Sequence, residues 1–220
     1  MVFQPMFSDG QPAAQPLGKI VCVGRNYAAH ARELGNDVPD APLLFIKPAT
    51  SAARLEEPIR VPRHLGEVHF ETELALLIGR PLRRVRPEQA LAAIAGIGLA
   101  LDLTLRDVQA ELKAKGHPWE RAKAFDGACP LSRFVALEGR EIDYADLHFS
   151  LSINGERRQS GHSANMIFGV AELLCEMSKS FTLEPGDVVL TGTPEGVGPL
   201  PEKARLELEL SDHMTIATRS

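Results

Sequence analysis

The chain has 220 residues, and its 24 Lys and Arg against 29 Asp and Glu give a formal net charge of −5. This length is enough for one sizeable core, so a single domain is expected. The acidic balance, without a long basic run, argues against a nucleic-acid partner and against an anionic membrane surface. No stretch approaches the ~20 apolar residues of a transmembrane helix.

The first 16 residues are rich in Pro, Gly and Gln. They lack a basic segment followed by an apolar run, so they predict an irregular lead-in and not a secretory signal. Residues 17–220 then form the single domain. The three cysteines are odd in number and fit no zinc spacing. Reduced thiols in a cytoplasm are the simplest interpretation.

The first half of the chain predicts short helices between strands. In chain order we expect a strand over 19–24, a helix over 26–35 with Asn26 as N-cap and Gly35 as stop, a strand over 68–79, a helix over 86–96, a strand over 97–103, and a helix over 104–116 that begins with a weak capping box at Thr104 and ends at Gly116.

The second half is predominantly β in pattern. We expect a hairpin over 147–159 turning at Asn154-Gly155, one long helix over 165–180, and strands over 186–192, 204–212 and 214–220. Strands dominate, and no regular alternation of strand and helix argues for a doubly wound parallel sheet. The pattern therefore predicts a mixed α+β fold, mainly β, with peripheral helices.

Two carboxylates interrupt the apolar strand predicted over 68–79. Glu71 and Glu73 are two residues apart, so in a strand they share one face. Two such charges repel, and burying either without a partner is costly. Exposure to water, pairing with Arg or Lys, and a shared cation are the three arrangements that resolve this conflict.

A third acid, Asp102, stands near the end of the strand predicted over 97–103, where the next helix begins. It can serve as a turn or cap residue. It can also complete a set of oxygen ligands with Glu71 and Glu73. Three carboxylates without nearby His or Cys suit Mg²⁺, Mn²⁺ or Ca²⁺ and not zinc, and they leave positions open for water or substrate.

His30 and Glu33 are three residues apart within the helix predicted over 26–35. On a helix such residues are neighbours on one face. A carboxylate beside an imidazole fixes its tautomer and makes it a better base. The same spacing is also typical of an ordinary surface pair on a short polar helix.

Four other features have both an ordinary and a functional interpretation. Lys47 follows an apolar run and is either an edge charge or an anion contact. Lys123 lies between apolar neighbours, where it either reaches water or meets a substrate anion. Gln109 belongs to the helix after Asp102 and is expected to be exposed. The Gly- and Pro-rich loop over 191–198 has backbone N–H groups that suit an oxyanion.

The stretches that carry these residues, taken in order, resemble the fumarylacetoacetate hydrolase family. The resemblance is closest to its short, single-domain acylpyruvate hydrolase and oxaloacetate decarboxylase type members, and it spans about residues 17 to 218. It rests on the segments VGRNYAAHARELG, PLLFIKPATS, HFETELALLIG, ALDLTLRDVQAELKAKGHPWERAKAFDGACPLS, SLSINGERRQSG and GDVVLTGTPEGVGPL.

The resemblance implies a β-sandwich roll with short peripheral helices and a lid helix, usually assembled as a homodimer. It makes residues 17–220 a catalytic domain that acts on a small 2-oxo acid. The implied site consists of Glu71, Glu73 and Asp102 as ligands of Mg²⁺ or Mn²⁺, His30 and Glu33 on the lid helix, Lys123 as the active-site lysine, and Arg25, Gln109 and Thr193 near the substrate.

The implied reaction is cleavage of a C–C bond in a pyruvoyl-containing substrate, which releases pyruvate through a metal-stabilised enolate. Acylpyruvate or fumarylpyruvate hydrolysis is the first expectation, with oxaloacetate decarboxylation beside it. Isomerisation or tautomerisation of oxaloacetate, or of a 2-hydroxyhepta-2,4-diene-1,7-dioate-type compound, is an alternative. A non-catalytic protein that holds Ca²⁺ structurally is the alternative from a different class.

Overall fold

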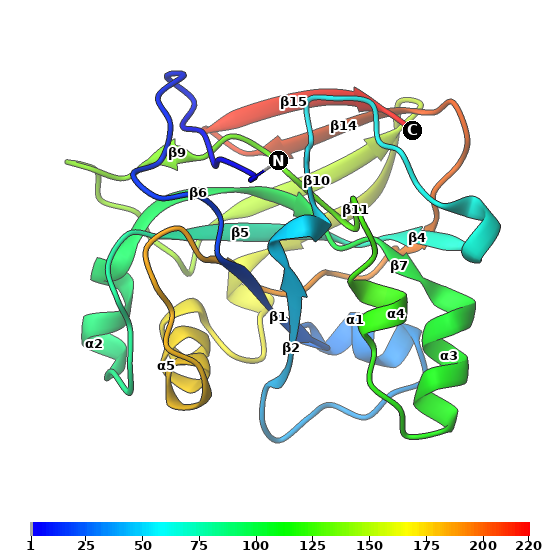
Figure 1. Cartoon of the computed structure of the whole chain (residues 1–220), viewed down its shortest axis with the longest axis horizontal. Helices are drawn as coiled ribbons and strands as arrows, with labels where there is room; N and C mark the ends of the chain where they lie inside the picture. Colours follow the sequence, from blue (N-terminus) through cyan, green and yellow to red (C-terminus); the bar gives the residue numbers. More distant parts are fainter. Residues whose placement is uncertain (1) are drawn as a thin grey trace.

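A computed structural model of the chain describes residues 2–220, and strands predominate among them (Figure 1). The largest sheet is curled and mixed: its order is β2-β1-β12-β5-β6-β8-β3, and β9 pairs with β6. Most neighbours are antiparallel, but β1 runs parallel to β12, and β3 to β8. The strands are β1 (Lys19–Gly24), β2 (Leu43–Pro48), β3 (Ala52–Arg54), β5 (Thr72–Ile78), β6 (Ile94–Leu101), β8 (Cys129–Leu131), β9 (Val135–Ala136) and β12 (Val188–Leu190).

Two smaller sheets complete the β structure. A four-stranded antiparallel sheet has the order β11-β10-β14-β15, and a three-stranded sheet has the order β13-β4-β7. Their strands are β10 (His148–Ile153), β11 (Glu156–His162), β14 (Arg205–Leu210) and β15 (Met214–Arg219), and then β4 (Val68–Phe70), β7 (Thr104–Leu105) and β13 (Gly198–Pro199).

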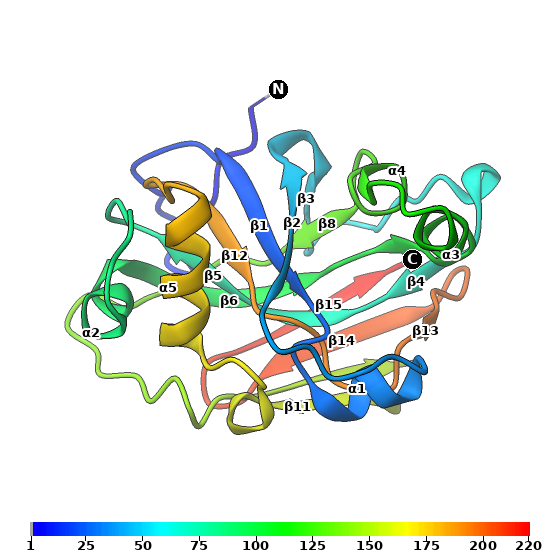
Figure 2. The same cartoon turned by 90° about the horizontal axis from the view of Figure 1, so that it is seen from below.

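The helices are short and lie at the periphery. They are α1 (Ala28–Glu33), α2 (Pro87–Ala90), α3 (Arg106–Ala114), α4 (Glu120–Lys123) and α5 (Val170–Ser180). In both views α2 and α5 lie together at one end of the molecule, and α3 and α4 lie at the other end (Figures 1 and 2). Within residues 2–220, no helix is both long and apolar enough to cross a bilayer.

The large sheet buries both of its faces. Alternate residues of β1 and β5 face opposite sides, so that Val21 and Leu76 join the main core, which continues into β10 and β14. Ile20 and Leu77 face a second, smaller cluster. Side chains of the N-terminal lead-in, including Phe7 and Ala13, cover this second cluster. The described residues 2–16 form only isolated β-bridges, and they pack against the sheet.

The mainly β, mixed fold expected from the sequence is confirmed. The predicted hairpin forms between β10 and β11, and both turn residues, Asn154 (φ 54°) and Gly155 (φ 85°), have the left-handed backbone of such turns. The stops predicted at Gly35 and Gly116 are also present, since each has positive φ directly after its helix.

Several predicted helix starts are wrong. Asn26 does not cap α1; its buried side chain instead bonds to Phe168 and Thr191. Thr104 does not cap α3, because residues 104–105 pair with β4 as a short strand. The helix predicted over 86–96 is only one turn, since its apolar end enters β6. The long helix begins at Val170, not at 165.

Candidate active site

The strand predicted over 68–79 is in fact two strands that belong to different sheets. β4 pairs with β13 and β7, whereas β5 pairs with β12 and β6. Glu71 stands at the break between them. Its carbonyl accepts a 2.8 Å hydrogen bond from the amide of Asp102, the residue that follows β6. The change of sheet therefore brings both acid-bearing segments to one point.

Glu71, Glu73 and Asp102 converge there, and we refer to them as the carboxylate trio. One carboxylate oxygen from each lies within 4.8 Å of the others. The three residues are at most 5% exposed, so solvation does not resolve their repulsion. Of the three arrangements left open by the sequence, exposure to water is thus excluded.

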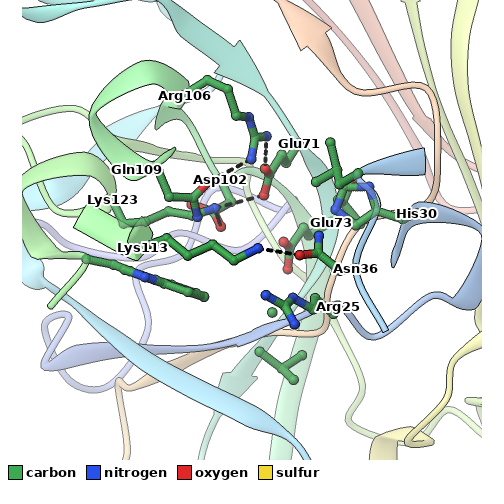
Figure 3. Close-up of a pocket in the computed structure, with 15 residues that line it drawn as sticks. Arg25, His30, Asn36, Glu71, Glu73, Asp102, Arg106, Gln109, Lys113 and Lys123 are labelled. Carbon is green, nitrogen blue, oxygen red and sulfur yellow. Dashed lines mark hydrogen bonds and ion pairs between the residues drawn. The ribbon is translucent and has the colours of Figure 1, made fainter. Parts of the chain in front are cut away.

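Three cationic side chains surround the carboxylate trio (Figure 3 shows two of them, Lys123 and Arg106). Lys123 Nζ lies 2.8 Å from Glu71 Oε2 and 2.6 Å from Asp102 Oδ2. Arg106 pairs with the second oxygen of Glu71. Lys47 Nζ lies 2.7 Å from Asp102 Oδ1. Buried acids that are paired in this way are the ones a folded protein tolerates.

The pairing fixes the charge states of Glu71 and Lys123. Burial alone would raise the pKa of Glu71, but the Lys123 ammonium and the Arg106 guanidinium outweigh it and hold that pKa well below its usual range. Burial alone would lower the pKa of Lys123, yet Asp102 and Glu71 raise it above its ordinary value. Lys123 is therefore a lasting positive charge and not a proton acceptor at neutral pH.

Glu73 is the least compensated member of the trio. Its Oε2 accepts a 2.6 Å hydrogen bond from the Gly192 amide. Among residues 2–220, no Lys or Arg forms an ion pair with Glu73. Burial, with the charges of Asp102 and Glu71, raises its pKa well above the ordinary value. A further cation beside Glu73 would supply the charge that this carboxylate lacks.

The donor set fits a hard divalent ion. All of its atoms are carboxylate oxygens, which Mg²⁺ and Mn²⁺ prefer. Asp102 Oδ1 is buried, and although Lys47 lies close to it, no group in the described part of the chain meets it with hydrogen-bond geometry. The trio thus retains a carboxylate oxygen without a hydrogen-bond partner, as a ligand set for an ion would.

His30 and Glu33 lie on the same face of α1, as their spacing predicts. His30 Nδ1 is 3.4 Å from Glu33 Oε2, and the His30 ring is buried. Glu33 also accepts the Gly196 amide, at 3.0 Å from Oε1 and 3.2 Å from Oε2. The carboxylate therefore orients the imidazole and joins α1 to the loop over 191–198.

Two amides of the loop over 191–198 are held by the protein itself and are therefore not free for an oxyanion. The amides of Gly192 and Gly196 donate to protein carboxylates, Glu73 and Glu33. Gly192 has φ +95°, and a Cβ there would lie 2.7 Å from Asn26 Cβ. Only glycine therefore brings this backbone close enough to hold Glu73.

Thr193 lines the cavity beside the trio, but its hydroxyl is already engaged. It donates to Thr72 O at 2.9 Å and accepts from Gln159 Nε2 at 2.8 Å. The other end of the Gln159 amide accepts the Thr72 amide at 2.9 Å. The buried Gln159 thus fastens the loop to the start of β5, a role that no sequence pattern indicated.

A cavity with about 490 Å³ of empty space, part of it open to solvent, lies over the trio. It is lined by α1 and the loop after it, and by residues of α3 and α4. Its polar lining includes the predicted residues Arg25, His30, Glu71, Glu73, Asp102, Gln109, Lys123 and Thr193.

Lys47 is the predicted substrate contact that does not line the cavity. It is fully buried behind Asp102, and its ammonium also donates to backbone carbonyls, among them Ala128 O at 3.0 Å. This placement leaves Lys47 no surface toward a ligand. It instead suits a residue that holds Asp102 in place.

Sequence reasoning missed Arg106 and Lys113, which line the same cavity from α3. Arg106 donates to Gln109 Oε1 at 2.7 Å, and Lys113 bonds to Asn36, in the loop after α1, across the entrance (Figure 3). A usable signal was present: Arg106 and Lys113 are three residues before and four after Gln109, so all three share one helix face.

The geometry thus places an all-oxygen donor set beside an imidazole that a carboxylate orients, in a cavity partly open to solvent. Comparisons with known proteins show the family. The family profile described as "Fumarylacetoacetate (FAA) hydrolase C-terminal" matches residues 19–219. The chain belongs to the fumarylacetoacetate hydrolase family of enzymes, as the sequence motifs indicated.

Three relatives illustrate the range of activities. The oxaloacetate tautomerase YcgM of Escherichia coli is 52% identical over 204 residues, which cover 93% of each chain. The human mitochondrial oxaloacetate tautomerase FAHD1 is 44% identical, over 89% of this chain and 91% of its own. The crystal structure of fumarylpyruvate hydrolase from Pseudomonas aeruginosa, in complex with Mn²⁺ and pyruvate, is 33% identical with a TM-score of 0.91, and the match covers 99% of this chain and 95% of that one.

Proposed function

We propose that this chain is a divalent-metal-dependent enzyme that interconverts the keto and enol forms of oxaloacetate. The observation that carries the proposal is the carboxylate trio beside the oriented imidazole of His30, with both lining one cavity. The likeness to two oxaloacetate tautomerases supports it. C–C bond hydrolysis, the first expectation from the sequence, becomes the second candidate.

The charge balance of the site favours a substrate with two negative charges. The three acids of the trio are matched by Lys47, Lys123 and Arg106. A divalent ion therefore adds uncompensated positive charge, and the side chains of Arg25 and Lys113 in the cavity wall add more. A dicarboxylate such as oxaloacetate supplies the missing negative charge, so the site attracts it more strongly than a neutral ketone.

His30 is the residue that transfers the proton. When Nδ1 of His30 donates its proton toward Glu33, Nε2 retains a lone pair and becomes the atom that takes a proton from C3 of the keto form or returns it. Glu33 stabilises the imidazolium that results. A divalent ion held by Glu71, Glu73 and Asp102 would act as a Lewis acid that polarises the 2-oxo group.

Lys123 and the α3 side chains bind and orient the substrate. Lys123 stays protonated, so it lowers the energy of negative charge that develops beside it. Arg106 and Gln109 contact each other at the cavity wall and present N–H donors to a carboxylate. Lys113, bonded to Asn36, keeps the far wall of the cavity positive and joins it to the loop after α1.

Hydrolysis of an acylpyruvate such as fumarylpyruvate is the second candidate. The His30–Glu33 pair favours it, because an imidazole that a carboxylate orients is also suited to activating a water molecule. The likeness to a fumarylpyruvate hydrolase supports it. Pyruvate release distinguishes the two reactions, because hydrolysis produces pyruvate and tautomerisation does not.

The decisive experiment starts from freshly dissolved enol oxaloacetate. The ultraviolet absorbance of the enol is followed with the purified chain in Mg²⁺, Mn²⁺ or EDTA, and pyruvate release from oxaloacetate and fumarylpyruvate is measured in parallel. His30→Ala is compared with His64→Ala, since His64 is an exposed imidazole outside the cavity. We expect metal-dependent decay of the enol without pyruvate release, lost by about 10²- to 10⁴-fold in His30→Ala and retained in His64→Ala.

Each alternative has its own signature in the same experiment. Pyruvate released from fumarylpyruvate at rates above those of enol decay would establish the hydrolase instead. Pyruvate from oxaloacetate alone would establish a decarboxylase. Metal-dependent melting without turnover on any of these substrates would favour the non-catalytic metal-binding protein.

A further inference from the structure

A second group of metal-ligating side chains lies on the surface, at the open end of the β10–β11 hairpin. Asp146, His148 and His162 place one ligand atom each within 4.8 Å of one another, and we call them the histidine cluster. None of the three lines the cavity over the carboxylate trio. His148 begins β10, and His162 ends β11, from which the chain runs on to α5.

The hairpin register places the two imidazoles side by side. His148 and His162 are directly opposite each other in the antiparallel pair, so their side chains leave the same face. The next pair is Phe149 with Gly161, and it faces the other side of the sheet. The Phe149 ring fills the space above Gly161, where a Cβ would lie 2.3 Å from the ring. The buried Phe149 therefore holds His148 outward.

The backbone on the other side of the histidines is also fixed. Ser163 N donates to Leu147 O at 2.9 Å, and Leu147 N donates to Ser163 Oγ at 2.8 Å. Leu147 and Ser163 are both buried. The segment that leads into β10 and the one that leads out of β11 are thus locked together directly beside the histidine pair.

The two imidazoles point at one carboxylate oxygen. Asp146 Oδ1 lies 3.0 Å from His162 Nε2 and 3.3 Å from His148 Nε2. The rings stack at 3.9 Å between centroids, with 17° between their planes. A turn at Asp143 positions the acid, because Asp143 O accepts the Asp146 amide at 3.1 Å. Three donor atoms therefore converge without any change of the backbone.

We propose that the histidine cluster binds a divalent transition-metal ion of the Zn²⁺, Co²⁺ or Ni²⁺ kind, through two Nε2 atoms and one carboxylate oxygen. In a tetrahedral zinc site the donor atoms are about 3.3 Å apart, close to the separations seen here. Imidazole nitrogen favours these ions, whereas the all-oxygen carboxylate trio favours Mg²⁺ or Mn²⁺. The chain thus has two metal sites of different selectivity.

Binding requires side-chain rotation but no change of the backbone: the stacked rings are nearly parallel, so at least one imidazole must turn to direct both Nε2 lone pairs at one ion. Each neutral imidazole shifts its proton to Nδ1, which leaves the Nε2 lone pair for the ion. The side chains are between 30% and 67% exposed, so water completes the coordination. The ion then links β10, the edge strand β11 and the turn at Asp143, and it stabilises the open end of the hairpin.

The test counts cobalt ions in the full-length chain. Equilibrium dialysis against Co²⁺, together with the visible absorption of bound Co²⁺, is measured for the wild type, His148→Ala, His162→Ala and Asp146→Asn. Each variant is made alone and with Glu73→Gln, which removes the carboxylate trio as a competing site. His64→Ala is the matched control, an exposed histidine outside both clusters.

In the Glu73→Gln background we expect one bound Co²⁺ with the stronger absorption of a four- or five-coordinate nitrogen-containing site. This ion should be lost in His148→Ala and in His162→Ala, bound at least about tenfold more weakly in Asp146→Asn, and unchanged in His64→Ala. Co²⁺ binding in this background that stays unchanged in His148→Ala and in His162→Ala would overturn the proposal. So would binding to the Glu73→Gln chain only at millimolar Co²⁺.

Discussion

The carboxylate trio and the histidine cluster are both sets of three converging ligand residues, but they stand in opposite environments. The trio is at most 5% exposed, and the protein surrounds it with three cationic side chains. The histidine cluster is open to water, with the Asp146 side chain 67% exposed, and its members contact chiefly one another.

This difference shows which of the two sites depends on the whole fold and which depends only on local structure. Buried acids cannot rely on water, so two lysines, an arginine and a glycine amide from four separate segments must surround them. An exposed cluster needs only a hairpin register and a turn. Changes at the trio should therefore affect folding and chemistry together, whereas changes at the histidine cluster should affect metal binding alone.

The largest expected effect comes from neutralising one acid of the trio. Glu73→Gln and Asp102→Asn should each lower metal-dependent turnover by roughly 10⁴-fold, because the ligand set for the ion is broken. Isothermal titration with Mn²⁺ should show weakened binding in both. Full Mn²⁺ affinity and turnover in Glu73→Gln would contradict the assignment of the trio.

The same two variants should differ in stability when no metal is present. Asp102→Asn leaves two buried lysines, Lys47 and Lys123, without their shared partner, so it should unfold more readily. Glu73 has no such partner, and its raised pKa means that ionising it costs folding free energy. Glu73→Gln should therefore melt at or above the wild-type temperature in EDTA.

The raised pKa of Glu73 also sets a pH dependence. Its protonated form favours the folded state, so this contribution is fully present below the ordinary Glu pKa and is lost as the pH rises through the raised value. In EDTA, the stability difference between Glu73→Gln and the wild type should grow with pH across that window. A difference that stays constant with pH would show that Glu73 is not the group that titrates.

Lys47 gives the next largest effect. Lys47→Met removes a fully buried partner of Asp102 and a donor to backbone carbonyls, so it should lower the free energy of unfolding by about 3 kcal/mol. Urea denaturation measures this loss. If Lys47→Met instead raised KM and left stability unchanged, the substrate contact expected from the sequence would be correct.

Lys47 also shows where sequence reasoning reaches its limit. The chain segment alone identifies a lysine after an apolar run, and both an edge charge and an anion contact fit that pattern. The structure places Lys47 in β2, and its ammonium pairs with Asp102, 55 positions later in the chain. Long-range contacts of this kind leave no local signal.

The site residues that the spacing alone indicated share one property: their chemistry is local, whereas the roles of Lys123 and Thr193 came only from the family resemblance. The Glu71–Glu73 and His30–Glu33 spacings, and the acid at the end of an apolar strand, are visible in short windows. The break in the strand at Glu71 was not, because β4 and β5 form one continuous pattern and are separated only by pairing with different sheets. The hairpin of β10 and β11 was predictable because its Asn154-Gly155 turn signal is local, whereas the register shift between Leu151 and Ser152 left no such signal.

A smaller effect is expected at Glu33. Glu33→Gln keeps an acceptor for the Gly196 amide but removes the charge that orients and stabilises the His30 imidazole. Turnover should fall about tenfold while Mn²⁺ affinity and folding stay unchanged. Glu67→Gln is the matched control, because Glu67 pairs with His69 at 2.6 Å outside the cavity. Equal losses in both variants would remove any special role for Glu33.

The smallest effect on folding is expected at the histidine cluster. In EDTA, His148→Ala should change the free energy of unfolding by no more than about 0.5 kcal/mol, since the exposed ring leaves no buried partner behind. With Zn²⁺ present, the wild type should gain stability that His148→Ala does not, because an ion bound only to the folded hairpin shifts the equilibrium by mass action. Thermal melts of Glu73→Gln and Glu73→Gln/His148→Ala separate this gain from binding at the trio. A large loss of unfolding free energy in EDTA would mean that the stacked imidazoles themselves stabilise the hairpin. The exposed cluster would then contribute to folding as the buried trio does, and the contrast between the two sites would fail.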